Sequence, residues 1–171
     1  MKYSKIIAND NEKENMIREW INPNKNIQFQ LLFLKSRDGS DCSSFHRNCD
    51  NKGPTLTLIE TDKGYKFGGY TPLDWESNYK EKTDELTFLF SLNQMKKYIK
   101  INNNSSIACS DDQGPQFGGG SDLYLNKDMN TGGSNGMSRF SSTTFLENYE
   151  LTNGECEFNV REMEVYKVEF N

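Results

Sequence analysis

The hydrophobic pattern changes its period several times along the chain, and each change predicts a different element. Between residues 10 and 26 the apolar residues recur at helical spacing behind an acidic start, and Asn22-Pro23 follows as a stop signal. The apolar residues of this segment are Met16, Ile17, Trp20 and Ile21. We expect one amphipathic helix packed by one face. In residues 27–36, IQFQLLFLKS, alternation gives way to an apolar run, which predicts a strand entering a buried sheet.

The next third of the chain predicts a short helix followed by a hairpin. Residues 40–54, SDCSSFHRNCDNKGP, offer Ser40 or Asp41 as the N-cap of a short helix and Gly53-Pro54 as its stop. Residues 55–70 form two β-rich runs joined by the turn TDKG, a strong hairpin signal. Further strands are predicted in LTFLFSL, KYIKI, IACS and the LYL that closes residues 114–125.

The last third combines a polar loop with a final strand. Residues 126–142, NKDMNTGGSNGMSRFSS, are rich in Gly, Asn and Ser and predict a long exposed loop. In residues 157–170, alternation of apolar and charged residues predicts a strand with one wet face. Several short strands and two short helices together indicate an α+β, mostly β fold: a sandwich of two antiparallel sheets with short flanking helices. A chain of 171 residues fits one domain, spanning 1–171.

Composition and charge narrow the classes of partner. The chain has 34% hydrophobic residues, yet 11 Phe, 8 Tyr and 2 Trp supply large buried areas from few positions. The net charge is −5 and the basic residues are scattered, which disfavours nucleic-acid binding. No segment has the roughly 18 apolar residues of a spanning helix, and the first residues lack a signal-peptide core. We therefore expect a soluble cytoplasmic protein with no direct membrane insertion, whose four cysteines are thiols.

Cys42, His46 and Cys49 are the candidate reactive residues, because spacings of four and seven place them on one helix face. A zinc site would need a further ligand, Cys109 or Cys156, brought in by the fold. A Cys42–His46 nucleophile pair or a redox-sensing Cys42 at the helix start are two further interpretations. The alternative is structural: Phe45 and Cys49 form the buried stripe of the helix, and His46 makes an ordinary hydrogen bond at its rim.

Carboxylates and loop oxygens give two weaker candidates. The acidic residues Asp74, Glu76, Asp84 and Glu85 flank one loop. They could supply a general acid-base pair, but solvated loop carboxylates are the favoured interpretation. Asn126, Asp128 and Asn130 alternate as calcium ligands do, but Met137 stands where an EF-hand needs a bidentate Glu. Turn formation is the favoured interpretation of these three side chains.

The glycine-rich stretch GPQFGGGSDLYL, residues 114–125, resembles a phosphate loop only superficially. Gly120 is followed by Ser121-Asp122 and a strand, whereas a Walker loop needs Lys and then Ser or Thr after its last glycine, with a helix behind them. The dinucleotide fingerprint also fails, because Leu123 occupies the position of its third glycine. We expect Gly118, Gly119 and Gly120, like Gly68 and Gly69 in KGYKFGGY, to bend strands beside packed aromatic residues.

Taken in order, several of these motifs resemble the TLDc domain family. They are residues 31–71, LTFLFSL, GPQFGGGSDLYL and VREMEVYKV, and the resemblance extends from about Ser4 to Phe170. It is greatest to stand-alone TLDc domains of single-celled eukaryotes. One departure is that Leu86 stands where animal members commonly have Glu before the matching Thr87, with Glu85 one residue early.

The resemblance implies a β-sandwich with flanking helices, no catalytic residues and no cofactor. It also implies a role in oxidative-stress resistance and in binding and regulating the vacuolar proton-pumping ATPase, so that the protein would lie at endolysosomal or vacuolar membranes through a partner. The chain is therefore expected to be a non-enzymatic protein-interaction domain whose partner is a protein complex. The alternative is a thiol-dependent antioxidant or weak enzyme that uses Cys42 or Cys49 with His46.

Overall fold

The computed structural model describes residues 1, 4–100, 103–118, 122–134, 140–141 and 150–171. Three helices lie within these residues: α1 (Asn11–Ile21), α2 (Lys35–Asp38) and α3 (Cys42–Cys49). The strands are β1 (Ile27–Leu34), β2 (Thr55–Thr61), β3 (Lys66–Thr71), β4 (Lys80–Lys82), β5 (Phe88–Ser91), β6 (Lys96–Lys100), β7 (Ile107–Cys109), β8 (Gln116–Phe117), β9 (Leu123–Leu125), β10 (Thr131–Gly133), β11 (Phe140–Ser141) and β12 (Glu157–Phe170). No helix in these ranges is long and apolar enough to cross a membrane.

The strands form one continuous antiparallel sheet rather than the two separate sheets expected from the sequence. Its order is β11-β6-β5-β3-β2-β12-β10-β9-β8-β7-β4, and β1 pairs additionally with β12. The long strand β12 is the reason for the continuity. Its first residues pair with β10, whereas the following residues pair with β2 and β1. A mostly β, antiparallel architecture with few helices is confirmed, but its two halves are joined through β12.

The sheet curls, so that its two halves share one core. Residues of β3, β5 and β12 meet residues of β7, β8 and β9 in this core, to which α3 contributes Phe45 and Cys49. Its aromatic centre consists of edge-to-face contacts of Trp75 with Phe45 and with Phe117, at centroid distances of 5.7 and 5.4 Å. Such pairs stabilise a core by about 0.5–1.5 kcal/mol beyond the area that they bury.

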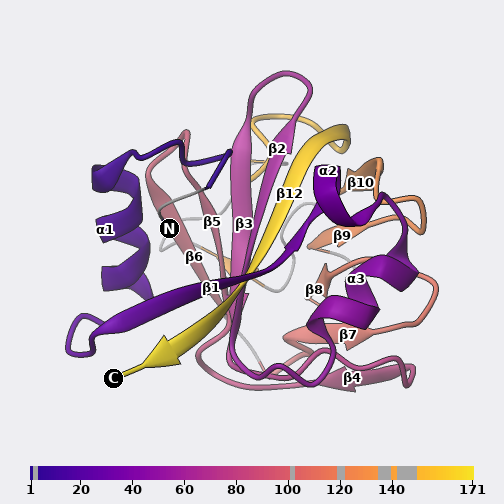
Figure 1. Cartoon of the computed structure of the whole chain (residues 1–171), viewed down its shortest axis with the longest axis horizontal. Helices are drawn as coiled ribbons and strands as arrows, with labels where there is room; N and C mark the ends of the chain where they lie inside the picture. The colour runs from indigo at the N-terminus through magenta and orange to yellow at the C-terminus, as the bar shows by residue number, and fades with distance from the viewer. Residues whose placement is uncertain (2–3, 101–102, 119–121, 135–139, 142–149) are drawn as a thin grey trace.

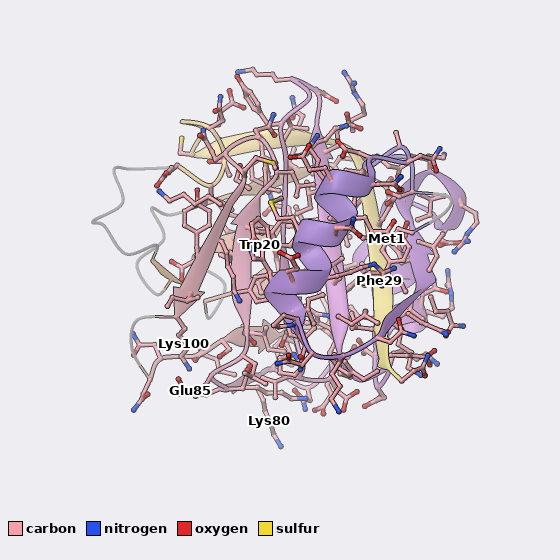
Figure 2. The ribbon with its side chains drawn as sticks, turned by 90° about the vertical axis from the view of Figure 1, so that its left-hand side faces the viewer. Met1, Trp20, Phe29, Lys80, Glu85 and Lys100 are labelled. Atoms are coloured by element: carbon pink, nitrogen blue, oxygen red, sulfur yellow. The ribbon has the colours of Figure 1, made fainter. Side chains whose placement is uncertain are left out.

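A second core lies under α1, on the other side of the sheet. The apolar stripe of the helix covers β3 and β5, and Trp20 packs 6.0 Å from Phe90 (Figure 2). Beside it, the segment before α1 is held by the buried carboxylate of Glu164 on β12. This carboxylate accepts hydrogen bonds of 2.6 Å from the Ser4 hydroxyl and 2.6 Å from the Lys5 amide.

The structure confirms the predictions that rest on residues close together in the sequence. The first helix, the short helix and the hairpin of β2 and β3 are confirmed, and Asp41 is the N-cap of α3. The expected exposed loop at 126–142 is wrong in its described part, because β10 lies in the sheet and Met129 is fully buried. The single wet face expected for β12 is also wrong at its centre, where residues 162–166 are buried on both faces. Both faces are covered there, one by each core.

Candidate functional site

Helix α3 carries the three residues that the sequence singles out for chemistry. The Asp41 side chain caps the helix by accepting a 2.9 Å hydrogen bond from the Ser44 amide. The helix lies against β1 and the β7–β8 region (Figure 1). Cys42, His46 and Cys49 are all buried and point into this packed surface.

Both ring nitrogens of His46 contact oxygen atoms, and neither contacts a thiol. Nδ1 lies 2.8 Å from Asp50 Oδ1, one turn further along the chain, and Nε2 lies 3.0 Å from the carbonyl oxygen of Gln113. A carbonyl oxygen can only accept, so Nε2 carries a hydrogen in this arrangement. The imidazole therefore connects the end of α3 to the turn after β7. Neither ring nitrogen is placed to take a proton from Cys42 or Cys49.

The two helix thiols are in surroundings that disfavour the thiolate. Burial raises the pKa of Cys49 well above its ordinary value, and the Asp50 carboxylate adds to that effect. Burial also raises the pKa of Cys42, although Lys127 acts in the opposite direction. The Cys42 thiol donates a 3.3 Å hydrogen bond to the carbonyl oxygen of Asp111. Reactive cysteines are normally accessible and have lowered pKa values, so this geometry favours a structural role for both.

The two glycine motifs lie next to packed side chains. A Cβ atom at Gly69 on β3 would come within 2.6 Å of the Phe117 ring, and one at Gly68 would overlap the backbone carbonyl of Thr57. Gly118 has φ of +70°, the left-handed region that favours glycine. Gly119 and Gly120 lie outside the described residues. Gly69 and Phe117 thus bring β3 and β8 together where the sheet curls.

The carboxylates and loop oxygens have local partners. Asp74 accepts a 2.6 Å hydrogen bond from the Gly53 amide, and Glu76 pairs with Lys82 at 2.6 Å, which lowers the pKa of Glu76. Asp128 accepts a 2.9 Å hydrogen bond from the Asn130 amide, the turn-forming contact expected from the sequence. Within the described ranges, no group of three His, Cys, Asp or Glu residues could hold a metal ion.

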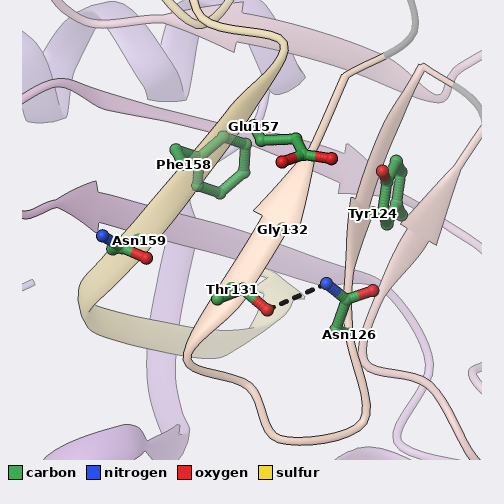
Figure 3. Close-up of a pocket in the computed structure, with 7 residues that line it drawn as sticks. All are labelled: Tyr124, Asn126, Thr131, Gly132, Glu157, Phe158 and Asn159. Atoms are coloured by element: carbon green, nitrogen blue, oxygen red, sulfur yellow. Dashed lines mark hydrogen bonds between the residues drawn. The ribbon is translucent and has the colours of Figure 1, made fainter.

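A pocket of about 390 Å³ lies elsewhere, on the outer face of β9, β10 and β12 (Figure 3). It is lined by Tyr124, Asn126, Thr131, Gly132, Glu157, Phe158 and Asn159. The strand register places these side chains side by side, because Tyr124 pairs with Gly133 and Gly133 pairs with Glu157. At Gly133 a Cβ atom would lie 2.5 Å from the Tyr124 hydroxyl oxygen. The missing side chain at this position lets the tyrosine ring lie over β10.

The polar groups of this pocket differ in whether they have hydrogen-bond or ion-pair partners within the described chain. The Asn126 amide donates a 2.8 Å hydrogen bond to the Thr131 hydroxyl, which fixes both side chains (Figure 3). Glu157 is exposed, and no cation of the described chain lies within ion-pair distance of it. A second hollow of about 140 Å³ shares Glu157 and Asn159 with the pocket and continues toward the β2–β3 turn.

Sequence reasoning misses Tyr124, Glu157 and Asn159 as members of one site. They lie on strands separated by more than thirty positions in the sequence, and only the pairing of β9, β10 and β12 brings them together. The signal that could have identified them is the adjacent pair Gly132-Gly133. Glycines inside a strand indicate close approach of another group.

Comparison with known proteins gives one family over nearly the whole chain. The model of the TLDc domain family matches residues 1–169. The chain is also 33% identical over 64 residues to the MTOR-associated protein MEAK7 of Danio rerio, covering 37% of this chain and 14% of that protein. It is 31% identical over 70 residues to the protein of the same name from Mus musculus, covering 41% of this chain and 15% of that protein. The chain thus corresponds to a small part of these curated relatives.

Proposed function

This chain belongs to the TLDc domain family, and from that membership we propose that it is a non-enzymatic domain that binds a protein complex. The observation that carries the proposal is the family match over residues 1–169. The relatives named MTOR-associated protein add support, because their name describes association with another protein. We propose that residues 1–171 act as one domain in this role.

The partner that we propose is the vacuolar proton-pumping ATPase, with a consequence for oxidative-stress resistance. This assignment rests on the resemblance of the sequence motifs to TLDc proteins. The chain would then be cytoplasmic and held at an endolysosomal or vacuolar membrane through its partner.

The binding surface that we propose includes the segment 74–84, which contains the edge strand β4, and the turn at residues 126–130 between β9 and β10. Tyr79 in the first segment is 67% exposed, an unusual position for a large aromatic side chain. Its hydroxyl donates a hydrogen bond to Asp111, which holds the ring in one place. A fixed, exposed tyrosine resembles the aromatic anchors that dominate protein interfaces.

Affinity purification tests the proposal directly. The tagged chain is incubated with detergent-solubilised vacuolar membranes, and recovered proton-pump subunits are quantified by mass spectrometry. In parallel, the purified chain is added to vacuolar vesicles and acidification is followed with a pH-sensitive dye. We expect recovery of pump subunits and a changed acidification rate.

A pair of single substitutions localises the contact. Tyr79→Ser should weaken binding about tenfold, the effect of losing one interface anchor. Phe170→Ser removes an aromatic side chain that is 41% exposed on β12, and should leave binding unchanged. Absence of pump subunits from the purification, together with unaltered acidification, would contradict the proposed partner.

A further inference from the structure

The pocket between β9, β10 and β12 has a lining that points to one class of ligand. Its polar groups are the Glu157 carboxylate, the Tyr124 hydroxyl, the Thr131 hydroxyl and the amides of Asn126 and Asn159. None of the described lining residues is a cation, so they would offer an anionic ligand such as phosphate only the repulsion of Glu157. A single carboxylate and neutral oxygens also make a poor metal site. A cationic organic group suits this lining.

Figure 3 shows how the two most distinctive side chains are arranged. The Glu157 carboxylate and the Tyr124 ring point toward one another across β10, and the strand register places Gly133 between these two residues. A flat cation in this gap could stack on the ring with one face and donate hydrogen bonds to the carboxylate from its edge. A guanidinium group has both properties, because it is planar and presents paired N–H donors that match a carboxylate.

We propose that this pocket receives the guanidinium group of an arginine side chain of a partner protein. The source of the arginine, but not the chemistry of the pocket, rests on the proposed function. Glu157 binds the guanidinium through its two oxygens, Tyr124 stacks on its face, and the amide oxygen of Asn159 accepts from its free edge. Gly133 keeps the gap open, because a side chain there would displace the tyrosine ring.

Charge in the adjoining hollow is consistent with a basic segment continuing past this arginine. The hollow is lined by Asp62, Lys63 and Glu155 as well as by Glu157. Lys63 forms an ion pair with Glu155, whereas the Asp62 carboxylate has no cation partner within the described part of the chain. Asp62 and Glu157, two carboxylates to which the described residues offer no cation, therefore lie along one groove.

The test uses a small probe, so that it does not depend on the partner. N-acetyl-arginine methylamide is titrated into the ¹⁵N-labelled chain, and amide shifts are followed by NMR. We expect saturable binding in the millimolar range, with the largest shifts at residues 124–126, 131–133 and 157–159. The lysine probe of equal charge should bind about threefold more weakly, since it lacks the planar fork. The neutral citrulline probe should not bind.

Variants separate a specific pocket from general attraction to an acidic protein. Glu157→Gln should weaken arginine binding about fivefold, and Gly133→Ala should weaken it while leaving Glu157 in place. Glu19→Gln is the matched control: it removes one exposed carboxylate from α1, at the opposite end of the molecule from β10 (Figure 1), and should change nothing. Thermal unfolding of each variant checks that the fold is kept.

Three results would overturn the proposal: equal affinity for the lysine and arginine probes, shifts scattered over all acidic surfaces, or binding unchanged by Glu157→Gln. Affinity purification of the partner distinguishes the two proposals. Recovery of a partner by a chain that does not bind the arginine probe would refute the pocket alone. Probe binding without any recovered partner would support the pocket and contradict the interaction role.

Discussion

The close approach of β3 and β8 makes Gly69 the most informative position for testing the fold. Gly69 pairs with Leu89 in the sheet and faces Phe117 of the other half. In Gly69→Ala, the new Cβ atom would lie 2.6 Å from the Phe117 ring and 2.9 Å from Leu89 Cδ2. Carbon atoms normally rest about 3.5–4.0 Å apart, so the ring must move by about 1 Å. Phe117 is almost fully buried against Trp75, which leaves it little room to move.

Overpacking of this size costs about 1–3 kcal/mol of unfolding free energy. For a chain of this length the corresponding fall in Tm is about 2–12 °C. Urea unfolding followed by tryptophan fluorescence measures the loss, because Trp75 contacts the displaced ring. In the double variant with Phe117→Leu, the smaller side chain should accommodate the alanine. The two changes should then be non-additive by about 1 kcal/mol, with the double variant more stable than the sum predicts.

Gly64→Ala provides the comparison. Gly64 has φ of +82°, and no atom lies within 4 Å of the position that a Cβ would take there. Alanine at this position is therefore strained by its backbone and not by packing. We expect it to destabilise the chain without any rescue from Phe117→Leu. Strict additivity of Gly69→Ala and Phe117→Leu would show that β3 and β8 do not meet as described, and would refute the shared core.

Three further predictions concern titratable and buried groups. Because burial raises the pKa of Cys42 and Cys49, alkylation with iodoacetamide should modify the exposed Cys156 first and Cys49 last; fastest labelling of Cys42 would contradict the structural role given to it. His46→Ala should lower the unfolding free energy by about 2 kcal/mol in urea, since the contacts of the ring with Asp50 and with the Gln113 carbonyl oxygen are lost, and an unchanged midpoint would disprove these contacts. Burial raises the pKa of Tyr70 to about 12, so the stability it contributes is complete below about pH 10 and is lost as the pH rises through 12. Tyr70→Phe should reduce that alkaline loss, and an identical pH profile for both proteins would show that Tyr70 is not buried in its neutral form.

Elements with a local signal could be predicted from the sequence. The α1 stripe, the Asp41 cap and the turn between β2 and β3 depend on residues within a few positions of one another. The short strands β4, β8 and β10 contain two or three residues each, too few to show a period. They are strands only because a neighbouring strand pairs with them, and that neighbour is set by the fold.

For the candidate residues, too, the sequence indicates what depends on near neighbours and not what depends on contacts with distant segments. The helical spacing of Cys42, His46 and Cys49 is sufficient to place them on one face, but not to show what that face touches. His46 is bonded to Gln113, which follows a strand distant in sequence, and this contact decides its role. The pocket of Tyr124 and Glu157 depends on strand pairing, and its sign in the sequence, the pair Gly132-Gly133, belongs to the strand that lies between these two residues.

The bridging position of β12 has a consequence for how the chain reaches its fold during translation. All other described strands precede β12, and yet it lies between β2 and β10 in the sheet and pairs Ile27 of β1 with Phe170. Until the ribosome releases this strand, the described strands of the two halves do not pair with one another, and the edge of β2 that faces β12 is unpaired. Such long-range pairing forms slowly, and open strand edges invite aggregation. The nascent chain should therefore depend on chaperones until β12 has left the ribosome, and premature termination before Glu157 should yield aggregates rather than a smaller folded protein.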